Sequence, residues 1–266
     1  MAIANALAFL LYLSCSVILI RRFVQPSQAT SITFPIGIAT IMALLFHGVD
    51  IFFTMQHAGG WDLGLFTSLS IATWLMALIT FVIGSKSPKA HPGMLIYPLV
   101  AFSLVMKTQL PSSQATSLPD PALEWHILLS LAAYSLFTLA AIQAVVLAIQ
   151  NQQLRQRHVA GLIRKLPPLQ TMETSLFQLI TVGFILLTAG LLAGIFFIEN
   201  IFAQHLVHKT ILSIISWCVF ATLLWGRQRY GWRGNTAIKW TLIGFIFLAF
   251  AYLGSKLVLE FLLSTA

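Results

Sequence analysis

The strongest constraint in this sequence is a series of apolar runs that carry almost no charge, each close to the length of a membrane-spanning helix. A helix needs about 20 apolar residues to cross roughly 30 Å of hydrocarbon. The shortest runs can reach the interface through the long side chains of Lys107 and Lys239. We therefore predict an all-α, polytopic membrane helix bundle with about eight transmembrane helices. The runs occupy residues 2–20, 32–49, 63–85, 92–106, 125–149, 174–198, 210–226 and 240–255.

The composition excludes a water-soluble fold. Hydrophobic residues make up 58% of the 266 residues and charged residues only 8%, and the mean hydropathy is +0.89. A chain this apolar cannot hide its hydrophobic surface in one water-soluble core. Because the loops between the runs are short, we predict that residues 1–266 form a single integral membrane domain. No Walker A, HExxH, GxSxG or GxGxxG pattern occurs, so nucleotide binding, zinc peptidase and serine hydrolase activities lack support.

Basic residues are concentrated in alternate loops, and this asymmetry predicts the orientation of the chain. Loops rich in Lys and Arg lie on the cytoplasmic side, which puts both termini outside. The formal charge of +8 then follows from topology and from attraction to anionic lipid, so we predict membrane lipid as a partner and no nucleic acid. The 12 of 15 basic residues on the predicted inner face are Arg21, Arg22, Lys86, Lys89, Arg155, Arg157, Arg164, Lys165, Arg227, Arg229, Arg233 and Lys239.

The inner loop 150–173 contains the string LRQRHVAGLIRKL, in which apolar residues recur at helical spacing with basic residues between them. We predict an amphipathic helix over 152–166 that lies in the cytoplasmic interface and ends at Pro167-Pro168. Lipid anchoring is the commoner use of such a helix. Docking of a protein partner is the alternative.

His126 stands at the outer mouth of the fifth run, directly after Glu124 and Trp125. An interfacial polar residue beside a belt tryptophan is a sufficient structural interpretation. The functional interpretation is ligation of haem iron by a neutral imidazole. His205 and His208 lie in a loop on the same predicted face, where they could take part in such a site. The residues alone leave both interpretations open.

A second group of ionisable residues lies near the outer end of the second run. His47 and Asp50 are three residues apart and therefore share one helix face. His57 and Asp62 follow, and Asp62 is placed to cap the third helix. Ionisable groups at such depth are costly and tend to face a cavity or a partner rather than lipid. His47 and His57 are therefore further candidate ligands for a group that enters from outside.

Four segments occur in an order and spacing typical of one membrane protein family. In these segments the chain resembles the cytochrome c assembly (CcsA/CcmC/HemX-like) membrane protein family, and it is most similar to the YpjD-type inner-membrane branch. The resemblance is strongest over residues 120–258. It implies a multi-pass protein of the bacterial inner (cytoplasmic) membrane, with termini on the periplasmic side and haem handling at the outer leaflet. The segments are 125-WHILLSLAAYSLF-137, 172-METSLFQLITVGFILLTAGLLAGIFF-197, 214-IISWCVFATLLWGRQRYGWRGNTA-237 and 249-AFAYLGSKLV-258.

Full members of this family hold haem on a tryptophan-rich outer loop between flanking histidines. His126 corresponds to the first of those histidines, and 199-ENIFAQHLVHKTIL-212 corresponds to the loop. The loop departs from the family pattern, because it has no tryptophan and Val207-His208 replaces the expected Trp-Asp pair. Indole rings supply most of the apolar contact with the macrocycle. We therefore do not expect a complete haem-lyase activity.

The resemblance thus implies a haem-binding or haem-handling protein in cytochrome complex assembly, with no catalytic residues. Haem is the expected cofactor, and no metal is expected beyond its iron. His126 is the expected ligand on one side, His205 or His208 the second ligand, and His57 and His47 more distant candidates. The alternative hypothesis is a non-enzymatic accessory or regulatory subunit of another membrane complex, such as a metal-ion transporter. A membrane protein partner is compatible with both.

Overall fold

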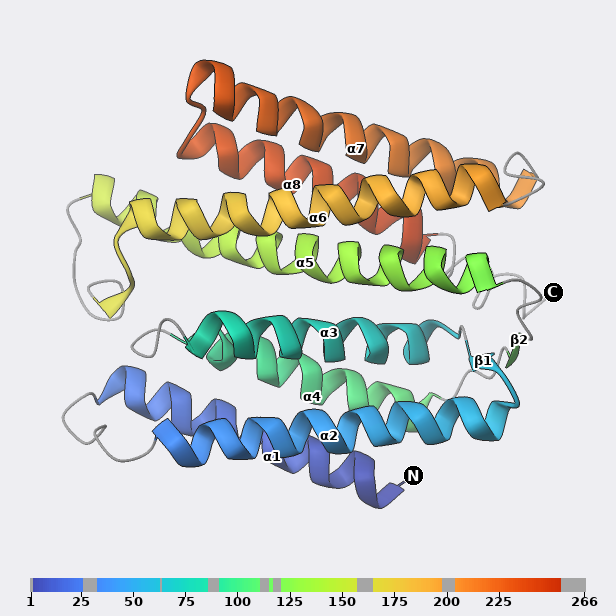
Figure 1. Cartoon of the computed structure of the whole chain (residues 1–266). Helices are drawn as coiled ribbons and strands as arrows, with labels where there is room; N and C mark the ends of the chain where they lie inside the picture. The colour runs from blue at the N-terminus through green and yellow to red at the C-terminus, as the bar shows by residue number, and fades with distance from the viewer. Residues whose placement is uncertain are drawn as a thin grey trace. The chain divides into compact units, whose positions relative to one another are not determined.

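The fold consists almost entirely of long helices (Figure 1). The structure is a computed structural model that describes residues 2–25, 33–62, 64–85, 91–110, 115–116, 121–156, 165–197 and 204–254. Seven helices are long and apolar enough to cross a membrane, and α4, with 17 residues, is shorter. The predicted all-α membrane bundle is therefore confirmed. The elements are α1 (Ala2–Val24), α2 (Thr33–Ala58), α3 (Leu65–Ser85), α4 (Gly93–Gln109), α5 (Pro121–Arg155), α6 (Leu169–Phe197), α7 (Gln204–Tyr230), α8 (Asn235–Ala249) and the π-helical turn η4 (Phe250–Gly254).

Two short strands join the segment after α2 to the segment after α4. Strand β1 (Trp61–Asp62) pairs antiparallel with β2 (Ala115–Thr116). Beyond β1, the Asp62 carboxylate accepts hydrogen bonds from the N–H of Gly64 at 2.9 Å and from the hydroxyl of Thr67 at 2.8 Å. The first donor lies just before α3 and the second is a side chain of its first turn. Asp62 therefore lies at the start of α3, as predicted, but neither bond comes from a backbone N–H inside the helix.

The helices pack into two compact units. The first consists of Met1–Leu118 with Ala160–Leu166, and the second of Pro119–Val159 with Pro167–Ala266. The prediction of a single membrane domain and the prediction that both termini lie outside stay predictions.

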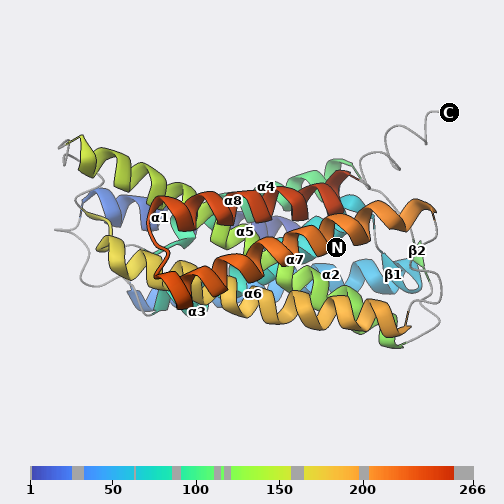
Figure 2. The same cartoon turned by 90° about the horizontal axis from the view of Figure 1, so that it is seen from above.

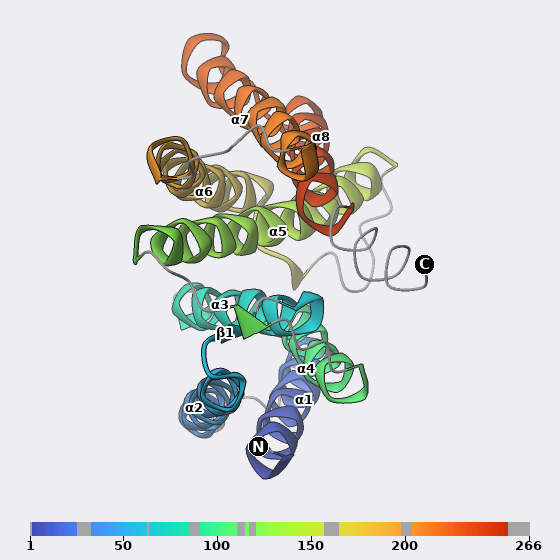
Figure 3. The same cartoon turned by 90° about the vertical axis from the view of Figure 1, so that its right-hand side faces the viewer.

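The first unit is a closed ring of four helices (Figures 1 and 3). Helix α1 packs against α2 and α4, and α3 packs against the same two helices. The Ser16 hydroxyl donates to the Met94 carbonyl at 3.2 Å, which ties the first turn of α4 to the interior of α1. Tyr12 and Tyr97 are completely buried in the core, with ring centroids 5.6 Å apart. This core is therefore rich in polar side chains for a membrane bundle.

The second unit has the same ring arrangement, with α5 and α7 each packed against α6 and α8 (Figures 1 and 2). Glycines allow close approach of its helices. A Cβ atom on Gly183 would lie 3.2 Å from the Phe137 ring, and one on Gly244 would lie 2.7 Å from the Phe220 ring. Phe137 and Phe220 themselves stack with centroids 3.9 Å apart. The core between α5 and α7 is accordingly apolar and tightly packed.

The structure differs from the sequence predictions at two helix ends. Residues 152–155 do not begin a separate interfacial helix, because α5 continues to Arg155; the predicted helix also includes 157–164, which lie outside the described residues. Helix α4 runs on to Gln109, so Lys107 lies in its last turn. Hydropathy marks where a chain leaves the hydrocarbon, whereas a helix continues for as long as its backbone bonds and side-chain packing allow.

Candidate functional site

His126 lies in the second turn of α5, and its ring contacts the backbone of α6. Its Nδ1 atom is 2.7 Å from the carbonyl oxygen of Gly190. Because a carbonyl oxygen only accepts, Nδ1 must carry the proton and donate it to this bond. The neutral ring then keeps the lone pair on Nε2. This is the tautomer with which a histidine ligates a metal while a backbone carbonyl orients its ring.

The absence of a side chain at Gly190 allows this contact. A Cβ atom there would lie 3.3 Å from Ser130 Oγ and 3.7 Å from the Ser130 nitrogen, one turn along α5 from His126. The backbones of α5 and α6 therefore approach closely, as small residues permit in membrane helices. The close approach brings a helix carbonyl within reach of the short imidazole side chain.

Helix α5 carries an exposed aromatic residue beside His126 and a partly buried one about two turns further on. Trp125 is 64% exposed, as expected for a residue at a membrane interface. Further along α5, Tyr134 contacts Tyr252 of η4 and Phe245 of α8, with centroids 5.4 and 6.2 Å away. His126 itself is partly exposed. Its ring is thus held at Nδ1 on a partly exposed side chain.

Trp217, the first tryptophan after the loop 199–212, has a structural role. Trp217 donates from its indole nitrogen to the Thr188 hydroxyl at 2.9 Å and stacks on Phe184, both in α6. Sequence reasoning did not assign these contacts. The available signal for these contacts was a threonine and a phenylalanine one helical turn apart, with a tryptophan on the next span.

His205 and His208 lie in the first turns of α7, which begins at Gln204. Helix α5 begins, α6 ends and α7 begins at the same end of the second unit (Figure 1). The backbone positions of these histidines are therefore at the end of the unit that carries His126. Their side chains lie outside the described residues.

His57 occupies the last turn of α2 in the first unit. Its Nδ1 atom donates to the Phe53 carbonyl at 2.7 Å, one turn earlier in the same helix, and the side chain is exposed. Nε2 is again the atom left with the lone pair. His57 therefore shares the ligating tautomer of His126, but it belongs to the other unit.

His47 is completely buried in the first unit. Its Nε2 atom lies 2.9 Å from Ser70 Oγ on α3, and its ring meets the edge of Tyr12 on α1 with centroids 5.9 Å apart. Neighbouring helices thus cover the ring on more than one side. A large ligand such as haem has no access to His47 in this arrangement.

Asp50 shares the buried face of α2 with His47, as its spacing predicted, but its partner was not foreseen. Lys107 donates to Asp50 Oδ2 at 2.7 Å and to the Thr54 hydroxyl at 2.7 Å. The Asn5 amide approaches the same carboxylate oxygen at 3.4 Å. The only signal was that α4 carries a lone cation and α2 a lone acid. Buried charges in membrane helices are expected to pair in this way.

Within the described ranges, no group of three or more His, Cys, Asp or Glu side chains is arranged to hold a metal ion.

The chain matches the family described as "Cytochrome C assembly protein" over residues 3–263. Inner membrane protein YpjD of Escherichia coli (strain K12) is 31% identical over 228 residues, which cover 83% of this chain and 85% of that protein. Protein HemX of Brevibacillus brevis is 26% identical over 157 residues (57% and 58%). Cytochrome c biogenesis protein CcsA of Chlamydomonas reinhardtii is 24% identical over 198 residues (73% and 54%). No solved structure matches the chain.

Proposed function

Since the chain belongs to the cytochrome c assembly protein family, we propose that it binds haem through His126 at the outer face of a bacterial inner membrane. We further propose that it does not complete haem attachment to a cytochrome. The chain is a multi-pass membrane protein by its helices, and the inner-membrane location is taken from the similar YpjD protein.

The single observation that carries the proposal is the hydrogen bond from His126 Nδ1 to the Gly190 carbonyl. It holds the imidazole in the tautomer whose Nε2 can donate a lone pair to iron. A carbonyl partner also raises the basicity of the ligating nitrogen. A polar residue that served only as an interface anchor would need no such fixed orientation.

The remaining residues of the proposed site lie at the end of the second unit that carries His126. His205 or His208 would supply the second axial ligand, because α7 begins at the end where α5 begins. Bound haem would supply a redox-active iron whose visible absorption reports its axial ligands. The chain's own part is to orient His126 and to cover the macrocycle with apolar side chains.

The limit on the activity comes from the loop before α7. No tryptophan lies between Glu199 and Thr210, and Trp217 is engaged with Thr188 and Phe184. A flat aromatic platform that presents haem to an acceptor protein is therefore not provided by this loop. A protein that binds haem but does not attach it to a cytochrome could carry or sense haem during cytochrome assembly.

The test is the visible spectrum of protein purified from haem-replete membranes. We expect a Soret band in the wild type, its loss in His126→Gly, and its recovery when free imidazole is added to that variant. His57→Ala, which removes an exposed histidine with the same tautomer in the first unit, is the matched control and should keep the band. A wild type without a Soret band, or a band indifferent to His126→Gly, would overturn the proposal.

A further inference from the structure

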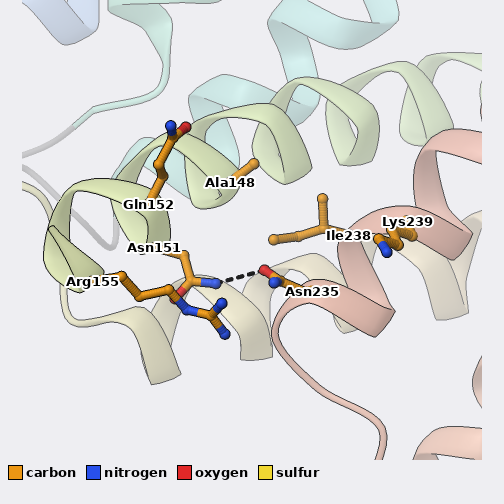
Figure 4. Close-up of a pocket in the computed structure, with 7 residues that line it drawn as sticks. All are labelled: Ala148, Asn151, Gln152, Arg155, Asn235, Ile238 and Lys239. Atoms are coloured by element: carbon orange, nitrogen blue, oxygen red, sulfur yellow. Dashed lines mark hydrogen bonds between the residues drawn. The ribbon is translucent and has the colours of Figure 1, made fainter.

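A pocket of about 330 Å³ opens at the end of the second unit where α5 finishes and α8 begins (Figure 4). This is the end opposite to His126, which lies near the start of α5. Its volume falls within the range of small-molecule sites, about 300–1,000 Å³. The lining residues are Ala148, Asn151, Gln152 and Arg155 from α5, and Asn235, Ile238 and Lys239 from α8.

The lining is cationic and contains no acidic side chain. Figure 4 shows Arg155 and Lys239 on either side of the asparagine pair between the two helices. In the part of the chain that the structure describes, neither cation forms an ion pair. Glu173, which lies near the start of α6, accepts the N–H of Gly234 at 2.7 Å and does not line the pocket. The positive charge of the lining therefore has no counter-charge in the pocket itself.

Amide groups add hydrogen-bond donors of fixed position. Asn151 Nδ2 donates to Asn235 Oδ1 at 2.7 Å, a bond that joins α5 to α8 across the pocket. This bond engages the oxygen of Asn235, so its amide nitrogen remains able to donate. A guanidinium, an ammonium and amide nitrogens together form a donor set suited to an oxyanion.

Aromatic residues place this end of the unit at the membrane surface. The Trp232 and Trp240 rings lie 5.4 Å apart, and Tyr230 stacks on Trp232 at 6.4 Å. Tryptophan and tyrosine gather at the level of lipid headgroups. Lys239 directly precedes Trp240 in α8, so the pocket lies at the depth of lipid phosphate groups.

We propose that this pocket binds the phosphate group of an anionic membrane lipid. Basic pockets between membrane helices on the cytoplasmic side are suited to such headgroups, and the basic loops predict that this end faces the cytoplasm. The Arg155 guanidinium and the Lys239 ammonium bind the phosphate oxygens. The hydrogen bond between Asn151 and Asn235 fixes the separation of α5 and α8, which carry these two cations. The inference goes beyond haem binding and does not depend on it.

Two variants separate the pocket from general surface charge. Arg155→Gln with Lys239→Gln removes both cations, and Ala148→Leu keeps the charges but fills part of the pocket. The matched control is Arg229→Gln with Arg233→Gln, an equal charge change at residues that are exposed like Arg155 and Lys239 but do not line the pocket. The protein is equilibrated with vesicles of phosphatidylcholine and phosphatidylglycerol, and the retained lipid is identified by native mass spectrometry.

We expect the wild type and the control to retain phosphatidylglycerol in preference to phosphatidylcholine. Binding should weaken by roughly fivefold for each pocket cation removed, and Ala148→Leu should also weaken it. Charges outside the pocket do not contact a phosphate held in it and act only at a distance, where salt screens them, so the control should change by less than about twofold. Equal losses in control and pocket variants, or an unaltered Ala148→Leu, would overturn the proposal. Displacement of the lipid by inorganic phosphate at low concentration would show a soluble ligand and overturn the lipid source.

Discussion

Lys107 Nζ lies 2.7 Å from Asp50 Oδ2, and the two side chains are only 10% and 4% exposed. The pair joins α4 to α2 inside the first unit, and Thr54 gives the ammonium a second acceptor. A buried ion pair is weak support for stability in itself, since desolvation opposes the attraction. Removal of only one of the two charges is costly, because the remaining charge is buried without a partner.

Removal of either charge should therefore destabilise the first unit strongly. We expect Asp50→Asn or Lys107→Met to lower the free energy of unfolding by about 3–5 kcal/mol. The double variant Asp50→Leu with Lys107→Met should lose much less than the sum of the single variants. Chemical denaturation in detergent measures the free energy of unfolding of the single and double variants. Asn5→Ala is the control, because it removes only the long 3.4 Å contact between the Asn5 amide and Asp50 Oδ2. Additive losses would show that the two charges do not depend on each other.

Tyr12 provides a second test of the polar core. Its ring is completely buried between His47 and Tyr97, and its hydroxyl has no hydrogen-bond partner among the described residues. A buried unpaired hydroxyl costs roughly 1–3 kcal/mol. Tyr12→Phe keeps the ring and should leave the melting temperature unchanged or raise it. A clear fall would mean that the hydroxyl is bound in the folded protein.

Gly84, near the end of α3, packs against His91, which lies just before α4. A Cβ atom on Gly84 would overlap the His91 ring, so Gly84→Ala should destabilise the first unit by about 1–3 kcal/mol. His91→Ala should relieve the overlap, so the double variant should be more stable than the sum of the single losses predicts. Gly37→Ala is the control, because nothing lies within 4 Å of the added carbon. It should be neutral or slightly stabilising. Equal effects at both glycines would contradict the packing.

His91 should also make stability depend on pH. Burial, with the nearby positive charge of Arg22, lowers the pKa of His91 from 6.5 to about 4. Its Nδ1 atom accepts the N–H of Gly93 at 3.0 Å, which requires that nitrogen to be unprotonated. The unfolded chain therefore binds a proton at higher pH than the folded chain.

The contribution of His91 is then constant above about pH 7 and falls as the pH drops from 6.5 toward 4, by up to roughly 3 kcal/mol. Below pH 4 both states are protonated, and the contribution changes no further. Unfolding measured at pH 7.5 and pH 5 in wild type and His91→Gln checks this expectation. A wild type and a variant with the same pH dependence would exclude His91 as the cause.

The positions of the membrane helices were predictable because each apolar run forms a helix independently of the other runs. A backbone in lipid must satisfy its hydrogen bonds internally, which a helix does within about 20 consecutive residues. The extent of α5 was not predictable in this way. It runs from Pro121 to Arg155, because its polar ends continue the helix beyond the apolar run at 125–149.

The sequence by itself determined the membrane fold, the family and the choice of His126 as candidate ligand, since these depend on local hydropathy and on the order of motifs. Only the tertiary structure decided what the key side chains do. Lys107 resembled a residue that reaches for the interface, until α2 brought Asp50, 57 positions away, to its ammonium. His126 acquired its tautomer from Gly190, 64 positions away. Such contacts depend on which helices become neighbours and on how each is rotated, and no single stretch of sequence contains that information.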